Sequence, residues 1–317
     1  LTRRLDNVPR VALAHLPTPL DPCPRLSARL GGPPIWIKRD DLTGLATGGN
    51  KTRYLEYVLA DARARGADTI VLSSGNQSNH CRQVAAACAR LGMGSVLLLW
   101  GSEPAEMEGN LLLDAVLGAD IRHLDIAGKA SGRAGHDLQF TEESPPQDRS
   151  LMRKAMEETK DRLRRQGRVP YCINTDASEG LQALGYVRCA LELIAQMEQA
   201  GIAAAHIWVA SGGATHAGLL AAGLLVGAPY RVTGISYHKS SADSARERIA
   251  AAATEAAQLL GYGLVVTAEQ VDNESGYATE PLYDGTELRW EPVLEVARAE
   301  GILLEPCYTG RAMLALC

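Results

Sequence analysis

This sequence has no excess of positively charged residues. Lys and Arg number 32 against 37 Asp and Glu, which gives a formal net charge of −5. Such a chain offers no basic stripe, so binding to nucleic acid or to an anionic membrane is not expected. Apolar runs of the roughly 18 residues that a membrane span needs are also missing, and so is the pattern of a signal peptide. The expected partners are small molecules bound at a local site.

Paired cysteines and clustered histidines are missing too. The seven cysteines are odd in number and include no C-x-x-C pair, which argues against a disulfide framework or a zinc knuckle. Reduced thiols, and hence a cytoplasmic protein, are the expectation. The seven histidines form no H-x-x-x-H pair, so no metal site is predicted. The lack of a G-x-S-x-G elbow disfavours a hydrolase.

Apolar runs alternate with helical patterns along most of the 317 residues. This length predicts two domains, and the rhythm predicts an α/β protein with parallel sheets that carry helices on both faces and bind ligands at the carboxyl ends of their strands. Residues 128–150 are rich in Gly, Ser, Pro and charge, which predicts a flexible excursion. The predicted strands are 69–74, 95–100, 170–174, 206–211, 231–237 and 263–268, and the predicted helices are 51–65, 78–91, 105–117, 150–166, 179–200, 215–226 and 241–260.

The stretch "GLATGGNKTRYLEYV", residues 44–58, has some features of a phosphate-binding P-loop. Gly44 and Gly49 have the separation that G-x-x-x-x-G-K-[ST] requires, but Asn50 intrudes before Lys51. The preceding "IWIKRDDLT" crowds its carboxyl end with charge, unlike the buried strand that leads into a P-loop. Lys51 therefore needs another role.

Two strand-to-helix turns are candidate anion sites. In "SSGNQSNHCRQV", Ser78, Asn79 and His80 open a helix, whose free N–H donors suit a carboxylate or a phosphate. In "VASGGATHAG", residues 211–215 can curl around an anion because their two glycines allow a close approach. Each turn has a plainer alternative, since a serine there is often only an N-cap and a glycine pair can be a simple turn. For His80 a hydrogen-bonding support role is predicted.

Together these motifs resemble the fold-type II pyridoxal-phosphate enzymes of the D-cysteine desulfhydrase and 1-aminocyclopropane-1-carboxylate (ACC) deaminase family, which share a fold like that of the tryptophan synthase beta chain. The likeness runs through "IWIKRDDLTGLATGGNKTR", "QSNH", "LGYVRCALEL" and "EGILLEPCYTGRAM". It implies two open twisted, mostly parallel sheets flanked by helices, with pyridoxal 5'-phosphate (PLP) in the cleft between domains. It also implies a large PLP-binding domain of residues 1–52 and 165–317, a small domain of residues 53–164, and a homodimer.

The resemblance assigns roles residue by residue. Lys51 carries PLP as an internal Schiff base, and its freed amine moves a proton. Asn79 bonds the phenolic oxygen of PLP, and Asn50 lines the cofactor site. The substrate carboxylate lies in the turn of Gln77, Ser78, Asn79 and His80, and the phosphate is held by Ser211, Gly212, Gly213, Ala214 and Thr215.

Thr309 stands where the ACC deaminases of this family have a glutamate that faces the pyridine nitrogen. A carboxylate keeps that nitrogen protonated, whereas a hydroxyl leaves it largely neutral. Opening a cyclopropane demands the stronger electron sink. The expected reaction is therefore α,β-elimination on a small amino acid with a β leaving group, giving a 2-oxo acid and ammonia. ACC deamination and a PLP-binding homologue without turnover are the alternatives.

Besides Ser78, which is also a candidate catalytic residue, tyrosines are candidates for assisting the chemistry. Tyr308 adjoins Thr309, and Tyr283 lies about where the family has an active-site tyrosine, a place for which Tyr277 competes. The plainer alternative is a packed tyrosine whose hydroxyl bonds the backbone.

Two departures from the family pattern affect the expected pocket. Tyr54 replaces a second lysine three residues after Lys51, which removes a candidate phosphate charge. The stretch "DASEGLQALGY", residues 176–186, differs as well, and by the resemblance it puts Asp176 and Glu179 near the substrate entrance.

Overall fold

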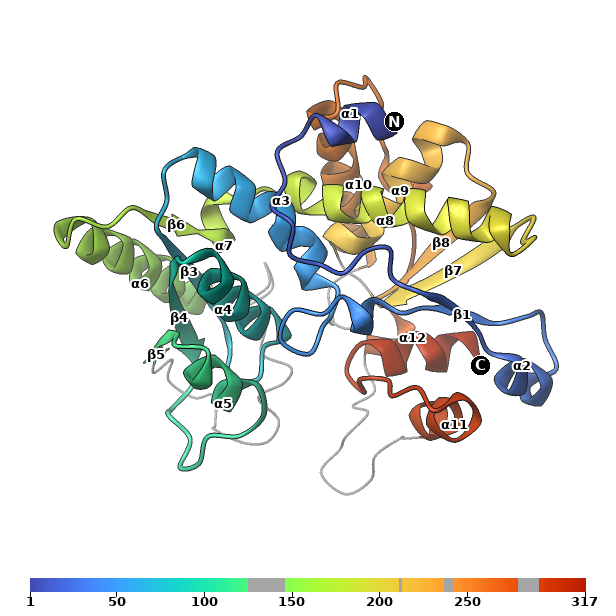
Figure 1. The fold of residues 1–317 in the computed structure, drawn as a ribbon, viewed down its shortest axis with the longest axis horizontal. Helices are drawn as coiled ribbons and strands as arrows, with labels where there is room; N and C mark the ends of the chain where they lie inside the picture. Colours follow the sequence, from blue (N-terminus) through green and yellow to red (C-terminus); the bar gives the residue numbers. More distant parts are fainter. Residues whose placement is uncertain (125–145, 211–212, 237–241, 279–290) are drawn as a thin grey trace. The chain divides into compact units, whose positions relative to one another are not determined.

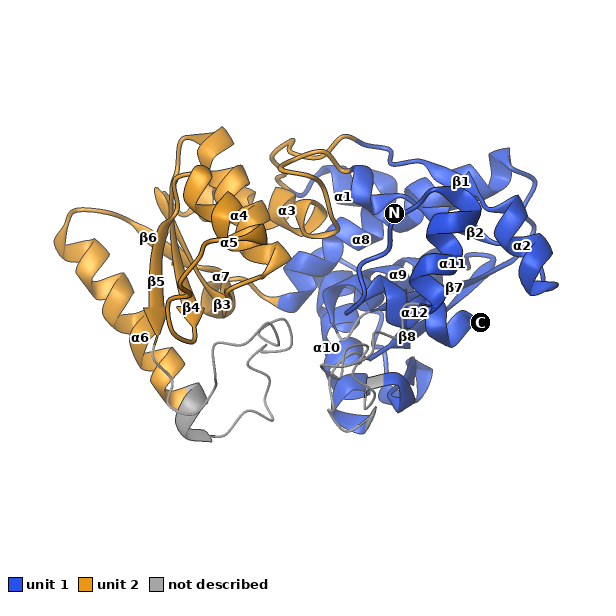
Figure 2. Ribbon diagram, turned by 90° about the horizontal axis from the view of Figure 1, so that it is seen from below, with its two compact units in different colours: residues 1–8, 16–42, 179–317 blue, residues 9–15, 43–178 orange. Residues whose placement is uncertain are grey.

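The computed structural model describes residues 1–124, 146–210, 213–236, 242–278 and 291–317. They form two compact units (Figure 2). Unit 1 consists of residues 1–8, 16–42 and 179–317, and unit 2 of residues 9–15 and 43–178. Each unit has its own parallel sheet. The domain boundaries expected from the resemblance, after residues 52 and 164, stay a prediction.

The sheet of unit 2 has four parallel strands in the order β5-β4-β3-β6 (Figure 1). The central strands are β3 (Thr69–Gly75) and β4 (Gly94–Trp100), and the edges are β5 (Asp120–Leu124) and β6 (Pro170–Cys172). The runs "TIVLSSG" and "GSVLLLW" are almost wholly buried, as expected for parallel strands that are covered on both faces.

Helices cover this sheet on both faces. Val71 and Leu98 pack against Met156 and Leu163 of α6 (Pro146–Arg165). Helices α4 (Asn79–Leu91) and α5 (Gly109–Val116) cover the other face (Figure 2). Helix α3 (Lys51–Ala64) packs beside α4, and the short α7 (Ile173–Asp176) follows β6.

The sheet of unit 1 has three parallel strands in the order β7-β8-β9, which are Ala205–Ala210, Tyr230–Ile235 and Asp272–Glu274. Helices α8 (Glu179–Gln199), α9 (Ala214–Val226) and α10 (Ala242–Leu259) pack on one another. Gly218 lets α9 approach α8, since a Cβ there would lie 2.3 Å from Ala183 O. The other elements are α1 (Thr2–Asp6), the antiparallel pair β1 (Leu20–Pro22) and β2 (Trp36–Lys38), α2 (Pro24–Leu30), α11 (Glu291–Glu300), α12 (Thr309–Leu316), and the 3-10 turns η1 (Asp40–Leu42), η3 (Ala268–Gln270) and η4 (Gly276–Ala278).

The predicted α/β class with parallel sheets flanked by helices is confirmed. One predicted strand is wrong, because residues 263–267 belong to no strand and 268 begins η3. There the hydroxyl of Thr254 in α10 accepts from Val266 N at 2.9 Å and donates to Val266 O at 3.4 Å. A side chain thus takes the hydrogen bonds that a neighbouring strand would need.

Some predicted boundaries also change. Residues 173 and 174, predicted as the end of a strand, begin α7 instead. The polar edge strands β5 and β9 were not predicted. Of the predicted excursion over 128–150, residues 128–145 lie outside the described part of the chain, and 146 already begins α6.

Three further observations bear on the kind of protein. Within the described ranges, no helix is both long and apolar enough to cross a membrane. The same residues contain no group of three or more His, Cys, Asp or Glu side chains placed to bind a metal ion. All seven cysteines are free thiols.

Candidate active site

Lys51 is the first residue of α3, and the loop before it holds it in place. Gly49 in that loop has a left-handed backbone with φ of 124°, and a Cβ there would lie 2.6 Å from Gln83 Nε2. The buried Thr43 hydroxyl bonds both backbone groups of Gly49, at 2.9 Å and 2.8 Å. Only glycine therefore fits at position 49 without strain.

The amine of Lys51 is prepared to act as a nucleophile. Burial lowers its pKa from 10.5 to about 8, because removal from water disfavours the charged form. More of the amine is then neutral near neutral pH, as attack on an aldehyde requires.

Tyr54, which the resemblance sets in the place of a second lysine, lies against Lys51 and Asn50. Its ring centroid is 5.2 Å from Lys51 Nζ, within the range of a cation–π contact. Its hydroxyl accepts from Asn50 Nδ2 at 3.1 Å. Tyr54 is buried, so the substitution orients Asn50 and packs under the Lys51 amine.

Gln83 joins the start of α3 to the start of α4. Its fully buried side chain accepts from Thr52 N at 2.7 Å and from the Thr52 hydroxyl at 2.9 Å through Oε1. Its Nε2 donates to Asn79 O at 3.1 Å. One side chain therefore fixes the residue after Lys51 and the first residue of the predicted anion turn. Sequence reasoning did not identify Gln83, because its partner Thr52 is 31 positions away.

The turn before α4 is organised largely by its own side chains. Ser78 is the N-cap, and its hydroxyl accepts from His80 N at 3.2 Å and Cys81 N at 3.3 Å. The amide of Gln77 is engaged with the start of α5, where Nε2 donates to Glu108 O at 3.0 Å. The expected substrate-binding roles of Gln77 and Ser78 stay predictions, and their side chains already serve the fold.

Two buried polar atoms of this turn have no hydrogen-bond partner among the described residues. They are His80 Nε2 and Asn76 Oδ1. Burial, together with the charge of Lys51, lowers the pKa of His80 to about 3, so its ring is neutral. Leaving such atoms unpaired is costly, and a polar ligand bound beside Lys51 would relieve that cost.

The predicted phosphate site begins α9 in unit 1. Gly213 is the N-cap, Ala214 begins the helix, and Thr215 is buried in its first turn, whereas Ser211 and Gly212 lie outside the described residues. The start of a helix suits a phosphate, because its N–H groups point toward the ligand and its dipole favours negative charge. The guanidinium of Arg248 also lies near this helix start, since its Nη2 is 3.9 Å from the position that a Cβ on Gly213 would occupy.

Glu179 holds that arginine, with Arg248 Nε 3.7 Å from Glu179 Oε1. Sequence reasoning did not point to Arg248.

Thr309 begins α12, which packs against β7, the strand that leads toward Gly213. The Thr309 hydroxyl donates to Glu305 O at 3.2 Å and accepts from Glu305 N at 2.8 Å. The buried Arg311 donates to Tyr277 O at 2.6 Å and to Cys307 O at 3.0 Å.

Arg311 therefore brings the backbone of Tyr277 to the turn that carries Tyr308. The competing Tyr283 lies outside the described part of the chain.

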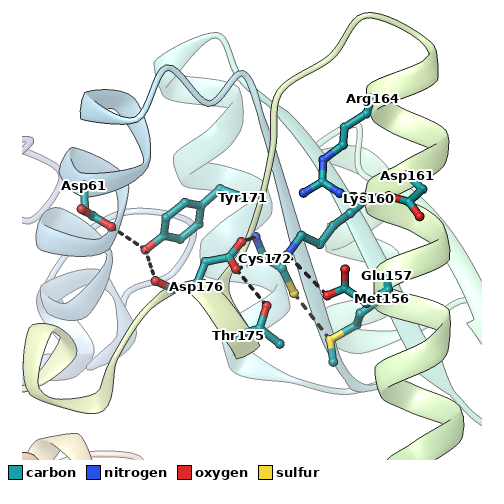
Figure 3. Close-up of polar contacts among 10 residues, drawn as sticks. All are labelled: Asp61, Met156, Glu157, Lys160, Asp161, Arg164, Tyr171, Cys172, Thr175 and Asp176. Carbon is teal, nitrogen blue, oxygen red and sulfur yellow. Dashed lines mark hydrogen bonds and ion pairs between the residues drawn. The ribbon is translucent and has the colours of Figure 1, made fainter.

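Asp176 has structural partners within unit 2 (Figure 3). Its carboxylate accepts from Cys172 N at 2.7 Å and from Lys160 Nζ at 3.2 Å, and its backbone oxygen accepts from Tyr171 OH at 3.1 Å. The same tyrosine donates to Asp61 at 2.7 Å. These bonds tie α6 and α3 to the β6–α7 turn, which explains Asp176 without a substrate.

Comparison with known proteins decides the family. Residues 11–317 match the family of pyridoxal-phosphate dependent enzymes. The chain belongs to this family. It is 37% identical over 322 residues to the 1-aminocyclopropane-1-carboxylate deaminase of Burkholderia cenocepacia, covering 98% of this chain and 88% of that protein. It is also 37% identical over 323 residues to the D-cysteine desulfhydrase of Klebsiella pneumoniae, covering 99% and 89%.

Solved structures agree with this membership. The crystal structure of an ACC deaminase homologue superposes with a TM-score of 0.82 at 33% identity, covering 99% of this chain and 87% of that one. The predicted resemblance, the fold-type II architecture and the dependence on PLP are therefore confirmed.

The residues present also fit PLP. In unit 2, an amine of lowered pKa lies with the unpaired His80 nitrogen beside it. Unit 1 offers a glycine N-cap at the start of a helix, with an arginine nearby. An amine suits an aldehyde and the helix start suits a phosphate.

Proposed function

We propose that this protein is a PLP-dependent lyase that carries out α,β-elimination on a small amino acid with a β leaving group. The products are a 2-oxo acid, ammonia and the leaving group. One observation carries the proposal, which is the position of Lys51 as the first residue of α3, with Gln83 bonding both Thr52 N and Asn79 O beside it. D-cysteine is the substrate class suggested by the D-cysteine desulfhydrase relative.

The chain's own residues have separate tasks in this reaction. Bound PLP supplies an electron sink for the carbanion that forms at the substrate α-carbon. Lys51 would hold the cofactor, and its amine would take the α-proton of the substrate. Asn79 and Asn50 would hold the cofactor ring, and Ser211, Gly212, Gly213, Ala214 and Thr215 would hold the phosphate.

The substrate is met by the turn before α4. Gln77, Ser78, Asn79 and His80 would bind its carboxylate at the start of α4, where the N–H groups of His80 and Cys81 also bond the Ser78 hydroxyl. Tyr308, with Tyr277 or Tyr283, would supply a hydroxyl near the leaving group.

Thr309 favours elimination over cyclopropane opening. Its hydroxyl makes two hydrogen bonds with the backbone of Glu305 and carries no charge with which to keep a pyridine nitrogen protonated. A neutral ring suffices for losing a good leaving group after α-proton removal. ACC deamination is the second candidate, because a 37% identical relative has that name. A PLP-binding homologue without turnover is the third.

A substrate panel separates these three. The PLP-loaded protein is offered D-cysteine, L-cysteate, β-chloroalanine and ACC, and 2-oxo acid release is followed with Lys51→Ala as the control. Pyruvate from one of the first three supports elimination, and a four-carbon 2-oxo acid from ACC supports ring opening. No product from any substrate, with PLP bound, would contradict the proposed activity.

A cytoplasmic location and a homodimer are also proposed. Seven free thiols favour a reducing compartment, and dimers are the commonest symmetric assembly. Light scattering on the purified protein tests the dimer, and cell fractionation tests the location.

A further inference from the structure

We infer that Asn110 is a positioning residue that decides which end of the Asn79 amide faces the cofactor. This inference rests on the proposed function. Asn110 lies in the first turn of α5, and its Nδ2 donates to Gln77 O at 2.8 Å and to Asn79 Oδ1 at 3.0 Å. Its backbone N–H donates to Gln77 Oε1 at 2.9 Å. Three hydrogen bonds thus join the start of α5 to the turn that carries Asn79.

Backbone partners fix the orientation of the Asn110 amide. A carbonyl oxygen only accepts, so the group that faces Gln77 O must be the NH2 of Asn110. The NH2 group of Asn110 also faces the side-chain amide of Asn79. If Asn79 turned its own NH2 group toward Asn110, two donors would face each other. Asn79 must therefore turn its oxygen toward Asn110, which leaves its own Nδ2 for another partner. Among the described residues, no oxygen accepts a hydrogen bond from that Nδ2.

Gln77 holds Asn110 in this position. Its Oε1 accepts from Asn110 N, and its Nε2 donates to Glu108 O at 3.0 Å. Gly109 lies between these two residues with φ of 57°, and a Cβ there would lie 2.4 Å from Gln77 Oε1. The start of α5 therefore has little freedom to present Asn110 differently.

Asn79 also lies close to the chain segment that carries the amine. Gln83 bonds both Asn79 O and the N–H of Thr52, the residue after Lys51. In PLP the phenolic oxygen stands on the ring carbon next to the one that bears the aldehyde. A donor beside Lys51 can therefore meet this oxygen and stabilise its ionised form, whereas an acceptor there would repel it. By holding the Asn79 oxygen, Asn110 turns the donor end of the Asn79 amide, its Nδ2, toward the cofactor.

Asn110→Asp tests this because a carboxylate only accepts. Asn79 would then turn its Nδ2 toward residue 110 and its oxygen toward PLP. The apparent affinity for PLP should fall at least about tenfold, the order expected for a hydrogen bond to a charged group. The visible band of bound PLP should lose intensity to the near-ultraviolet form in which the phenolic oxygen holds the proton. Asn79→Asp should produce the same spectrum.

Matched variants separate positioning from folding. Asn174→Asp makes the same chemical change at another bridging amide of unit 2, which bonds Ser73 N at 2.8 Å and Ser73 O at 3.2 Å. This variant should keep the affinity and the band of the wild type. Asn110→Ala removes the donor without adding charge, and it serves if the aspartate variant does not fold. If Asn110 acts through Asn79, adding Asn110→Ala to Asn79→Ala should cause no further loss.

The outcomes distinguish this inference from the proposed function. Wild-type affinity and an unchanged band in the folded Asn110 variants would overturn the inference and leave the function standing. A further loss in the double variant would show that Asn110 acts by a route other than Asn79, which also overturns the inference. Wild-type protein that takes up no PLP would overturn the proposed function, and the inference with it.

Discussion

Replacing Gln83 with leucine tests whether one buried amide holds the two helix starts of the site together. The side chain of Gln83 makes three hydrogen bonds, to Thr52 N, Thr52 Oγ1 and Asn79 O. Leucine has a similar size but no polar atom. A buried polar group that loses its partner costs about 1–3 kcal/mol. Thr52 is fully buried, and its N–H would keep only the long bond to Gly49 O at 3.4 Å, so it bears most of this cost.

The other two groups contribute less to the expected loss. The Thr52 hydroxyl keeps Thr43 Oγ1 at 3.5 Å, and Asn79 is only half-buried. We therefore expect Gln83→Leu to lower the free energy of unfolding by about 2–4 kcal/mol and to weaken PLP binding, because Lys51 and Asn79 lose their common support.

Urea unfolding of the cofactor-free protein and PLP titration measure the two effects, and Gln196→Leu is the matched control. Gln196 also bridges polar groups, since it donates to Thr18 O at 2.9 Å and accepts from Lys38 at 2.7 Å, but it lies in unit 1. Gln196→Leu should lower the free energy of unfolding but leave the affinity of the protein for PLP unchanged. A loss below about 1 kcal/mol in Gln83→Leu, with unchanged PLP affinity, would refute the reasoning.

Three further predictions concern other positions of unit 2. Gly109→Ala should destabilise by about 1–3 kcal/mol, because φ is 57° and the new Cβ meets Gln77; an unchanged urea midpoint would contradict this. The pKa of Lys51 is about 8 in the folded protein and 10.5 in the unfolded chain. At pH values between these two pKa values the unfolded chain binds more protons than the folded protein, so the free energy of unfolding rises with pH in that range. Lys51→Met should lack that rise in a pH series of unfolding measurements. Asp176→Asn should cost about 1–2 kcal/mol at pH 7 by weakening the hold on Lys160. Because Lys160 and Cys172 N lower the pKa of Asp176, that difference should shrink as pH falls, and a pH-independent difference would contradict the ion pair.

Local patterns made much of the fold predictable. The strands β3 and β4 are continuous apolar runs, and helices such as α4 have a capping serine at one end and a glycine at the other, so their signals lie within a few residues. The motif around Lys51 was found for the same reason.

What sequence reasoning missed depends on contacts between distant positions. Strand β9 reads "DNE" and pairs only because β8 lies beside it. Residues 263–268 have the composition of a strand, but Thr254 takes the hydrogen bonds of Val266.

The candidate site shows the same division. Lys51 and Ser78 were marked by their own neighbours, and Ser78 is seen to be the N-cap. Gln83 and Asn110 were not, because each acts across 31 positions of sequence on residues that only the fold brings near. A glutamine inside a helix, or an asparagine in the first turn of a helix, has no sequence neighbours that indicate a hydrogen bond to a distant residue.

The most direct test of the account is to locate the attachment of PLP. The purified protein is incubated with PLP, reduced with borohydride, digested, and analysed by mass spectrometry. We predict one pyridoxyl adduct, on Lys51, which is absent from Lys51→Ala. An adduct on another lysine, or none at all, would contradict the central claim.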